Sequence, residues 1–173
     1  MNNMNVQSSS TLDLPSFCRE PATIDTALMQ SASIITIDGD TGAGKSSLGK
    51  ELAQRLGGEH VEVDSFLLGN REPYLKQLNK EDLTAHLEAI RQHPIIVEGI
   101  LLLDVLDNLQ IRADYLVFAK KFINGQREQD KYLLYPDWLP RAQCAREIAE
   151  YYRRQKPWLK ANLAVTLHIS TGL

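Results

Sequence analysis

Cysteine, charge of one sign and long apolar runs are all scarce in this chain of 173 residues. The two cysteines, Cys18 and Cys144, stand far apart and form no CxxC pair, which indicates ordinary reduced thiols of a cytoplasmic protein. The formal net charge is only −3, whereas a general nucleic-acid binder has a strongly basic footprint. The composition therefore argues against a disulfide scaffold and against a nucleic-acid partner.

No segment has the length and composition of a membrane span. The longest apolar stretch, residues 95–103, is interrupted by Glu98 and is too short to cross a bilayer. The first ten residues are polar and lack the basic start and apolar core of a signal peptide. We expect no membrane association, a poorly ordered lead-in over residues 1–22, and one domain over residues 23–173.

Strand-like and helix-like segments alternate along this domain. The alternation predicts an α/β fold with a mainly parallel sheet, helices on both faces and right-handed crossovers. Ligands of such sheets bind beyond the carboxyl ends of the strands. We expect strands at 34–37, 60–64, 95–98, 115–118 and 163–167, and helices at 23–30, 47–56, 79–92, 101–109, 121–132 and 141–156.

The first expected strand leads directly into a complete phosphate-binding P-loop. Its glycines let the backbone N–H groups point at phosphate oxygens, and the helix that follows adds its positive N-terminus. Lys45 would reach the β- and γ-phosphates, and the Ser46 hydroxyl would ligate Mg²⁺. The loop predicts the binding of ATP or another nucleoside triphosphate with Mg²⁺, through Gly39, Asp40, Thr41, Gly42, Ala43, Gly44, Lys45, Ser46 and Ser47.

Two carboxylates stand where the second and third expected strands end. Asp64 could accept the proton of a substrate hydroxyl that attacks the γ-phosphate, hold Mg²⁺ through water, or cap the next helix. Glu98 ends a strongly apolar strand, where an unpaired carboxylate is costly. A metal-bound water, the Ser46 hydroxyl or backbone N–H groups near Ile100 would satisfy it. We favour Asp64 as the catalytic base and Glu98 as the acidic group beside the metal.

Cations are concentrated over residues 120–156. Phosphoryl transfer spreads negative charge over the γ-phosphate, and arginines on a closing lid can stabilise that charge and help to exclude water. Most of these side chains are expected on solvated helix faces. Arg127 and Arg141 are the predicted catalytic arginines, with Arg146 as a further candidate. The full set is Lys120, Lys121, Arg127, Lys131, Arg141, Arg146, Arg153, Arg154 and Lys156.

Other patterns predict structure rather than chemistry. Residues 79–82 have the letters of a guanine-recognition motif, but they precede the third strand and are expected to begin a helix. The four histidines show no metal-ligand spacing. Trp138 and Trp158 stand beside prolines and are expected to be packing anchors rather than base-stacking residues.

Four blocks of the sequence, residues 37–46, 64–66, 96–102 and 157–163, resemble the uridine kinase-like branch of the P-loop kinases. That group includes uridine/cytidine kinases, pantothenate kinases and phosphoribulokinases. The resemblance implies a three-layer sandwich with a five-stranded parallel sheet of order 2-3-1-4-5, a helical lid, and Mg-ATP as phosphoryl donor. It also implies that Asp64 is the catalytic base and Glu98 the acidic group near the metal.

Two features depart from that family. The segment between Asp64 and Glu98 is shorter than a uridine kinase uses for its nucleoside-binding insertion. The usual arginine pattern of the lid is not reproduced by residues 126–131.

Three functions follow as hypotheses. The leading one is a small-molecule kinase that transfers the γ-phosphate of ATP to a hydroxyl group. The second is a nucleoside monophosphate kinase, for which Arg71 is the better placed of two arginines that could bind the acceptor phosphate. The third is a non-catalytic ATP-binding module. The sequence indicates neither the acceptor nor whether the chain forms a homo-oligomer.

Overall fold

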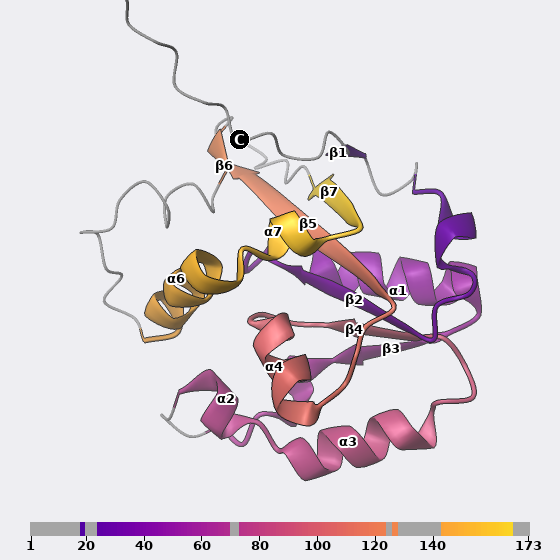
Figure 1. Ribbon diagram of the computed structural model, residues 1–173, viewed down its shortest axis with the longest axis horizontal. Coiled ribbons are helices and arrows are strands. Elements are labelled where there is room, and N and C mark those ends of the chain that lie inside the picture. The colour runs from indigo at the N-terminus through magenta and orange to yellow at the C-terminus, as the bar shows by residue number, and fades with distance from the viewer. Residues whose placement is uncertain (1–17, 20–23, 70–72, 124–125, 128–142, 168–173) are drawn as a thin grey trace, which may run out of the picture.

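The computed structural model describes residues 18–19, 24–69, 73–123, 126–127 and 143–167, and it builds them around one mixed sheet (Figure 1). The strands are β1 (Cys18–Arg19), β2 (Ile34–Gly39), β3 (Glu59–Glu62), β4 (Ile95–Glu98), β5 (Tyr115–Ile123), β6 (Gln126–Arg127) and β7 (Leu163–Leu167).

The strands follow the order β1-β7-β5-β2-β4-β3, and every neighbouring pair in that list is parallel. The short β6 pairs antiparallel with the end of β5. The five strands expected from the sequence are β2, β3, β4, β5 and β7, and they stand in the predicted order 2-3-1-4-5, which is confirmed. The strand that enters the P-loop is therefore central, with the strand that ends at Glu98 beside it.

Helices and 3-10 turns connect these strands. They are η2 (Thr26–Met29), α1 (Lys45–Leu56), η3 (Val63–Phe66), α2 (Tyr74–Gln77), α3 (Lys80–Ala89), α4 (Leu102–Leu109), α6 (Gln143–Gln155) and α7 (Pro157–Lys160). Asn79 is the N-cap of α3 and its side chain accepts a hydrogen bond from the Asp82 N–H, at 3.2 Å. The expectation that residues 79–82 begin a helix is confirmed.

Alternate residues of the strands supply two separate cores, one on each face of the sheet. On β4, Ile96 packs in the core beneath α1, while Ile95 and Val97 pack in the core that contains side chains of α3, α4 and α6. Figure 1 shows α1 on one side of the sheet and α3 and α4 on the other. The period-two pattern of apolar residues thus produces the three-layer sandwich.

The predicted helix over residues 121–132 is wrong at its start. Residues up to Ile123 continue β5, and the backbone of Gln126–Arg127 pairs with Phe122 and Ile123 as β6. The apolar, β-branched run that begins at Tyr115 favours a longer strand, and the Asn-Gly dipeptide at 124–125 is a strong hairpin signal that the helical interpretation overlooked. The lid expected over the residues that follow lies largely outside the described residues.

The lead-in predicted over residues 1–22 also lies largely outside them. Within that segment, Cys18–Arg19 is described as β1, in parallel register with Ala164 and Val165 of β7. Among the described residues, none of the helices has the length and apolar character that crossing a bilayer requires.

One glycine fixes how closely the P-loop approaches the sheet. Gly39 has a φ of 143°, and a Cβ atom there would lie 2.1 Å from the carbonyl oxygen of Ala119 on β5. The same carbonyl accepts a hydrogen bond from the Asp40 N–H at 3.3 Å. Only glycine permits this contact, so the entry of the loop is held against the neighbouring strand.

Candidate functional site

The P-loop leaves β2 in a conformation that two further glycines allow. Gly42 and Gly44 both have left-handed backbones, with φ of 69° and 84°, and Gly44 is the N-cap of α1. Lys45, the first residue of α1, is buried and its Nζ donates to the carbonyl oxygens of Gly39 (3.2 Å) and Asp40 (2.9 Å). An ammonium group has three donors, so two hold it in the loop while the third can reach a phosphate oxygen.

Ser46 and Glu98 meet at the carboxyl edge of the sheet. The Ser46 hydroxyl donates to Glu98 Oε1 at 2.6 Å, and Glu98 is only 6% exposed. Of the partners expected for this buried carboxylate, the hydroxyl is the one that contacts it. A hydroxyl and a carboxylate are oxygen donors of the kind that Mg²⁺ takes beside nucleotide phosphates, so this pair fits that cation.

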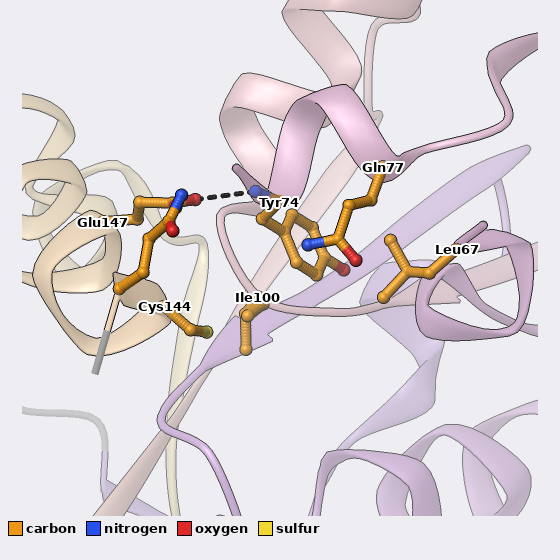
Figure 2. Close-up of a pocket in the computed structure, with 7 residues that line it drawn as sticks. Leu67, Tyr74, Gln77, Ile100, Cys144 and Glu147 are labelled. Atoms are coloured by element: carbon orange, nitrogen blue, oxygen red, sulfur yellow. Dashed lines mark hydrogen bonds between the residues drawn. The ribbon is translucent and has the colours of Figure 1, made fainter. Parts of the chain in front are cut away.

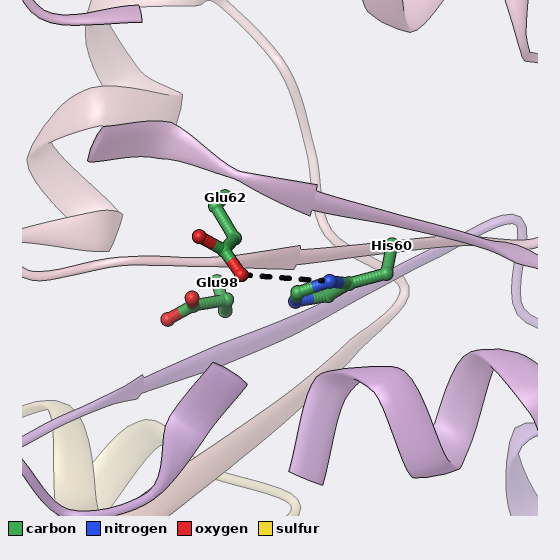
Figure 3. A group of neighbouring side chains, drawn as sticks. All are labelled: His60, Glu62 and Glu98. Atoms are coloured by element: carbon green, nitrogen blue, oxygen red, sulfur yellow. Dashed lines mark ion pairs between the residues drawn. The ribbon is translucent and has the colours of Figure 1, made fainter. Parts of the chain in front are cut away.

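His60, Glu62 and Glu98 form a neighbouring group of potential metal ligands (Figure 3), with ligand atoms within 4.8 Å of one another. Positions 60 and 62 share one side of β3, and Glu62 is in register with Glu98. His60 Nε2 is buried without a hydrogen-bond partner among the described residues, and burial lowers the pKa of the imidazole despite the nearby Glu98 and Glu62. The histidine spacing gave no sign of this group, because strand register, not sequence distance, assembles it.

Asp64 lies two residues beyond the end of β3, within η3. Its Oδ1 accepts a hydrogen bond from the Tyr74 hydroxyl at 2.5 Å, and the Tyr74 N–H donates to Glu147 Oε2 at 2.8 Å. Burial and the Asp64 carboxylate both raise the pKa of Tyr74, which keeps the phenol protonated as a donor. Tyr74 and Glu147 were missed in the sequence, because nothing in their spacing connects either residue to Asp64.

A cavity of about 480 Å³ opens beside Tyr74 (Figure 2). It lies between the segment after β3, the turn after β4 and the first turns of α6. The described residues that line it are Leu67, Tyr74, Gln77, Ile100, Gln143, Cys144 and Glu147. Tyr74, which lines this cavity, donates its hydroxyl hydrogen bond to Asp64 and so links the cavity to that carboxylate.

Two tyrosines of α6 bind the carboxylates on either side of Gly39. The Tyr151 hydroxyl donates to Asp38, and the Tyr152 hydroxyl donates to Asp40 Oδ1 at 2.8 Å. Asp38 is fully buried, and its burial raises the pKa to about 7, although hydrogen bonds from Tyr151 and from the Gly39 N–H lower it. These contacts join α6, more than a hundred residues away in sequence, to the entrance of the P-loop.

The arginines considered in the sequence analysis have four outcomes. Arg141 lies outside the described residues, as does Arg71 of the monophosphate kinase hypothesis, and only the backbone of Arg127 is placed, in β6. Arg146 is exposed on α6. Arg154 pairs with Asp104 of α4, with Nη1 2.9 Å from Oδ1 and Nη2 2.5 Å from Oδ2. Arg154 therefore acts as a structural link between two helices.

Two other members of the sequence analysis have structural positions. Trp158 is buried and makes edge-to-face contacts with the rings of Phe118 and Tyr152, which confirms that it is a packing anchor. Lys120, counted among the lid cations, is buried at 5% exposure in β5. Trp138 lies outside the described residues.

No family model and no curated protein sequence matches this chain. Several solved structures are similar to it. One is described as a possible uridine kinase from Bacillus stearothermophilus, with 16% identity over 76% of this chain and 87% of that one, and a TM-score of 0.46. Another is a shikimate kinase from Acinetobacter baumannii, with 16% identity, coverage of 86% and 89%, and a TM-score of 0.44. A dephospho-CoA kinase from Campylobacter jejuni is 14% identical, with coverage of 80% and 90% and a TM-score of 0.36. At these identities and TM-scores the likenesses identify no substrate for this chain.

Proposed function

We propose that this chain is an ATP-dependent phosphotransferase that moves the γ-phosphate of ATP to a hydroxyl group of a small molecule. The observation that carries the proposal is the arrangement at one edge of the sheet. The P-loop with Lys45, the Ser46–Glu98 pair and Asp64 lie at or just beyond the carboxyl ends of the adjacent strands β2, β4 and β3. Asp64 in turn is bonded to Tyr74 on the wall of a cavity.

Each of these groups has a separate task in the proposed reaction. The P-loop N–H groups and Lys45 bind the phosphates of ATP and offset their charge. Ser46 and Glu98 hold Mg²⁺, which when bound neutralises charge on the phosphate oxygens. Asp64 accepts the proton of the acceptor hydroxyl as its oxygen forms the new bond to phosphorus, and ADP leaves. Tyr74 is a positioning residue, since its hydroxyl fixes one oxygen of Asp64.

The fixed conformation of the P-loop supports this assignment. The Lys45 ammonium is already held by two carbonyls, and the loop entry is fixed against β5 by Gly39. Donors fixed before the substrate binds need no reorganisation during the reaction, which is where electrostatic catalysis gains most.

A coupled ADP-release assay with Mg-ATP and a panel of alcohols, nucleosides and sugars tests the proposal. We expect one acceptor class to accelerate ADP release in the wild type and not in Lys45→Ala. Asp64→Asn is expected to lower acceptor-dependent release by about 10²–10⁴-fold, the usual contribution of a general base, while its affinity for Mg-ATP stays within about twofold.

Asp107→Asn is the matched control, because Asp107 is an exposed carboxylate on α4, and it is expected to retain wild-type activity. Wild-type turnover in Asp64→Asn would show that Asp64 is not the base. If the wild type releases ADP at the same rate with and without an acceptor, the chain is an ATPase rather than a transferase.

A further inference from the structure

The cavity beside Tyr74 has an apolar floor and an acidic rim. Leu67, Ile100 and the ring of Tyr74 supply its apolar surface, and Glu147 projects from α6 toward Tyr74 on its other side (Figure 2). A volume of about 480 Å³ is in the range of small-molecule sites. Such a pocket takes a compact ligand with one apolar flank and a few polar groups.

Its charge is of one sign over the described part of the chain. Glu147 is the single ionised residue among the described residues that line the cavity, and the other polar ones, Gln77, Gln143 and Cys144, are uncharged. None of the described cations forms an ion pair with Glu147, which accepts a hydrogen bond from the Tyr74 backbone N–H. Among the described residues, a negative ligand would therefore meet only the Glu147 carboxylate here, whereas a positive ligand would meet a partner of opposite charge.

Tyr74 contacts two carboxylates, of which Glu147 lines the cavity. Its hydroxyl binds Asp64 and its backbone N–H binds Glu147, so the two acids lie at opposite ends of one tyrosine residue. Asp64 does not itself line the cavity, so a ligand held at Glu147 would reach it by extending along Tyr74 to the hydroxyl that donates to Asp64.

The pKa of Cys144 is shifted by the same two carboxylates. It lies one turn before Glu147 on α6, and burial, Glu147 and Asp64 all raise the pKa of its thiol. Among the described residues, both carboxylates thus act on a thiol in the wall of the cavity.

We propose that the phosphoryl acceptor is an amine-bearing alcohol, with its ammonium group at Glu147 and its hydroxyl at Asp64. This inference rests on the proposed function and names its substrate class. The hydroxyl oxygen bonds to the γ-phosphorus, the bond from that phosphorus to the bridging oxygen of ADP breaks, and the hydroxyl proton passes to Asp64. The ammonium group takes no part in bond making and determines which alcohols bind.

Protection of Cys144 from N-ethylmaleimide measures occupancy of the cavity without requiring turnover. The probes are matched sets with the same number of carbons: 5-amino-1-pentanol, 1,5-pentanediol and 5-hydroxypentanoate, and the corresponding three-carbon set. Each is titrated against the alkylation rate at pH 8 with Mg²⁺ and a non-hydrolysable ATP analogue. Cys144→Ala supplies the background from Cys18.

We expect an amino alcohol of one set to protect Cys144 at a concentration at least tenfold lower than its diol, and the hydroxy acid to protect least. About tenfold corresponds to 1.4 kcal/mol, at the lower end for a hydrogen bond to a charged group. Glu147→Gln should abolish the preference. Glu150→Gln, which changes an exposed acid on the same helix, should retain it.

Equal protection by the diol, better protection by the hydroxy acid, or a preference that survives Glu147→Gln would each overturn the inference. An ADP-release assay with the same probes tests the proposed phosphotransferase activity separately from binding. Transfer to a hydroxy acid without amine preference would preserve the kinase and refute the acceptor class. Amine-selective protection with no ADP release for any acceptor would preserve the acidic pocket and refute the proposed function.

Discussion

Replacing Asp38 by Asn should remove a pH-dependent loss of stability. Asp38 is fully buried beneath the P-loop, and its burial raises the pKa from 3.8 in the unfolded chain to about 7 in the folded protein. The folded state therefore binds more protons than the unfolded state between about pH 4 and pH 7. Because of this, the contribution of Asp38 to stability is largest in acid and is lost as the pH rises through the folded value.

The two pKa values set the size of the effect. Integrating proton binding between pH 5 and pH 8 gives a loss of about 2–3 kcal/mol in the free energy of unfolding from this one carboxyl group. Asn has the shape of the protonated carboxyl, with one oxygen to accept from the Gly39 N–H and an NH₂ group facing Tyr151. Asp38→Asn should be close to the wild type at pH 5 and more stable than it by about 2–3 kcal/mol at pH 8.

Urea unfolding at pH 5 and pH 8 measures how the stability gap between Asp38→Asn and the wild type changes with pH. An unchanged m-value checks that the unfolding transition itself is the same. Glu88→Gln is the control, since Glu88 is an exposed acid on α3 and its variant should follow the wild type at both pH values. If the gap between Asp38→Asn and the wild type is the same at pH 5 and pH 8, the carboxyl group does not titrate as its burial requires.

Three further outcomes follow from individual contacts. Gly39→Ala should lower the unfolding free energy by more than about 4 kcal/mol in urea titrations, because the new Cβ meets a backbone carbonyl of β5. Gly57→Ala is the control and should lose about 1 kcal/mol, because its φ is 64° but its Cβ would meet nothing within 4 Å. Glu98→Gln should raise the Mg²⁺ concentration for half-maximal ADP release several-fold, and an unchanged Mg²⁺ dependence would separate this residue from the metal. Tyr152→Phe should lower the unfolding free energy by about 1–3 kcal/mol, because the buried Asp40 carboxylate loses a donor, and a variant of wild-type stability would show that the contact is dispensable.

The strands of the sheet could be predicted because each is identified by residues that are adjacent in the sequence. A β-branched run such as residues 34–37 identifies a buried strand, and the glycine spacing that follows identifies the loop that leaves it. Strand order then followed from the resemblance to a known family. The ends of β4 and β7 were predicted to the residue.

The extension of β5 was missed because the two lysines at 120–121 resemble the start of a solvated helix. Lys120 is instead buried in the strand, where the sheet context overrides the charge of the side chain.

The acceptor side of the site could not be predicted, because long-range packing assembles it. Tyr74 and Glu147 meet only when α6 folds against the segment after β3. The hydrogen bonds of Tyr151 and Tyr152 to Asp38 and Asp40 likewise join residues separated by more than a hundred positions. No residue spacing encodes these contacts.

Transfer of labelled γ-phosphate from ATP is the most direct test of the proposed phosphotransferase. The labelled product is resolved into inorganic phosphate and phosphorylated acceptor, with amino alcohols offered as acceptors and Lys45→Ala and Asp64→Asn as comparisons. We predict that the wild type places the label on the acceptor and that both variants leave it on ATP. Label found only in inorganic phosphate, or retained on ATP by a wild type that binds Mg-ATP tightly, would contradict the assignment of a phosphotransferase.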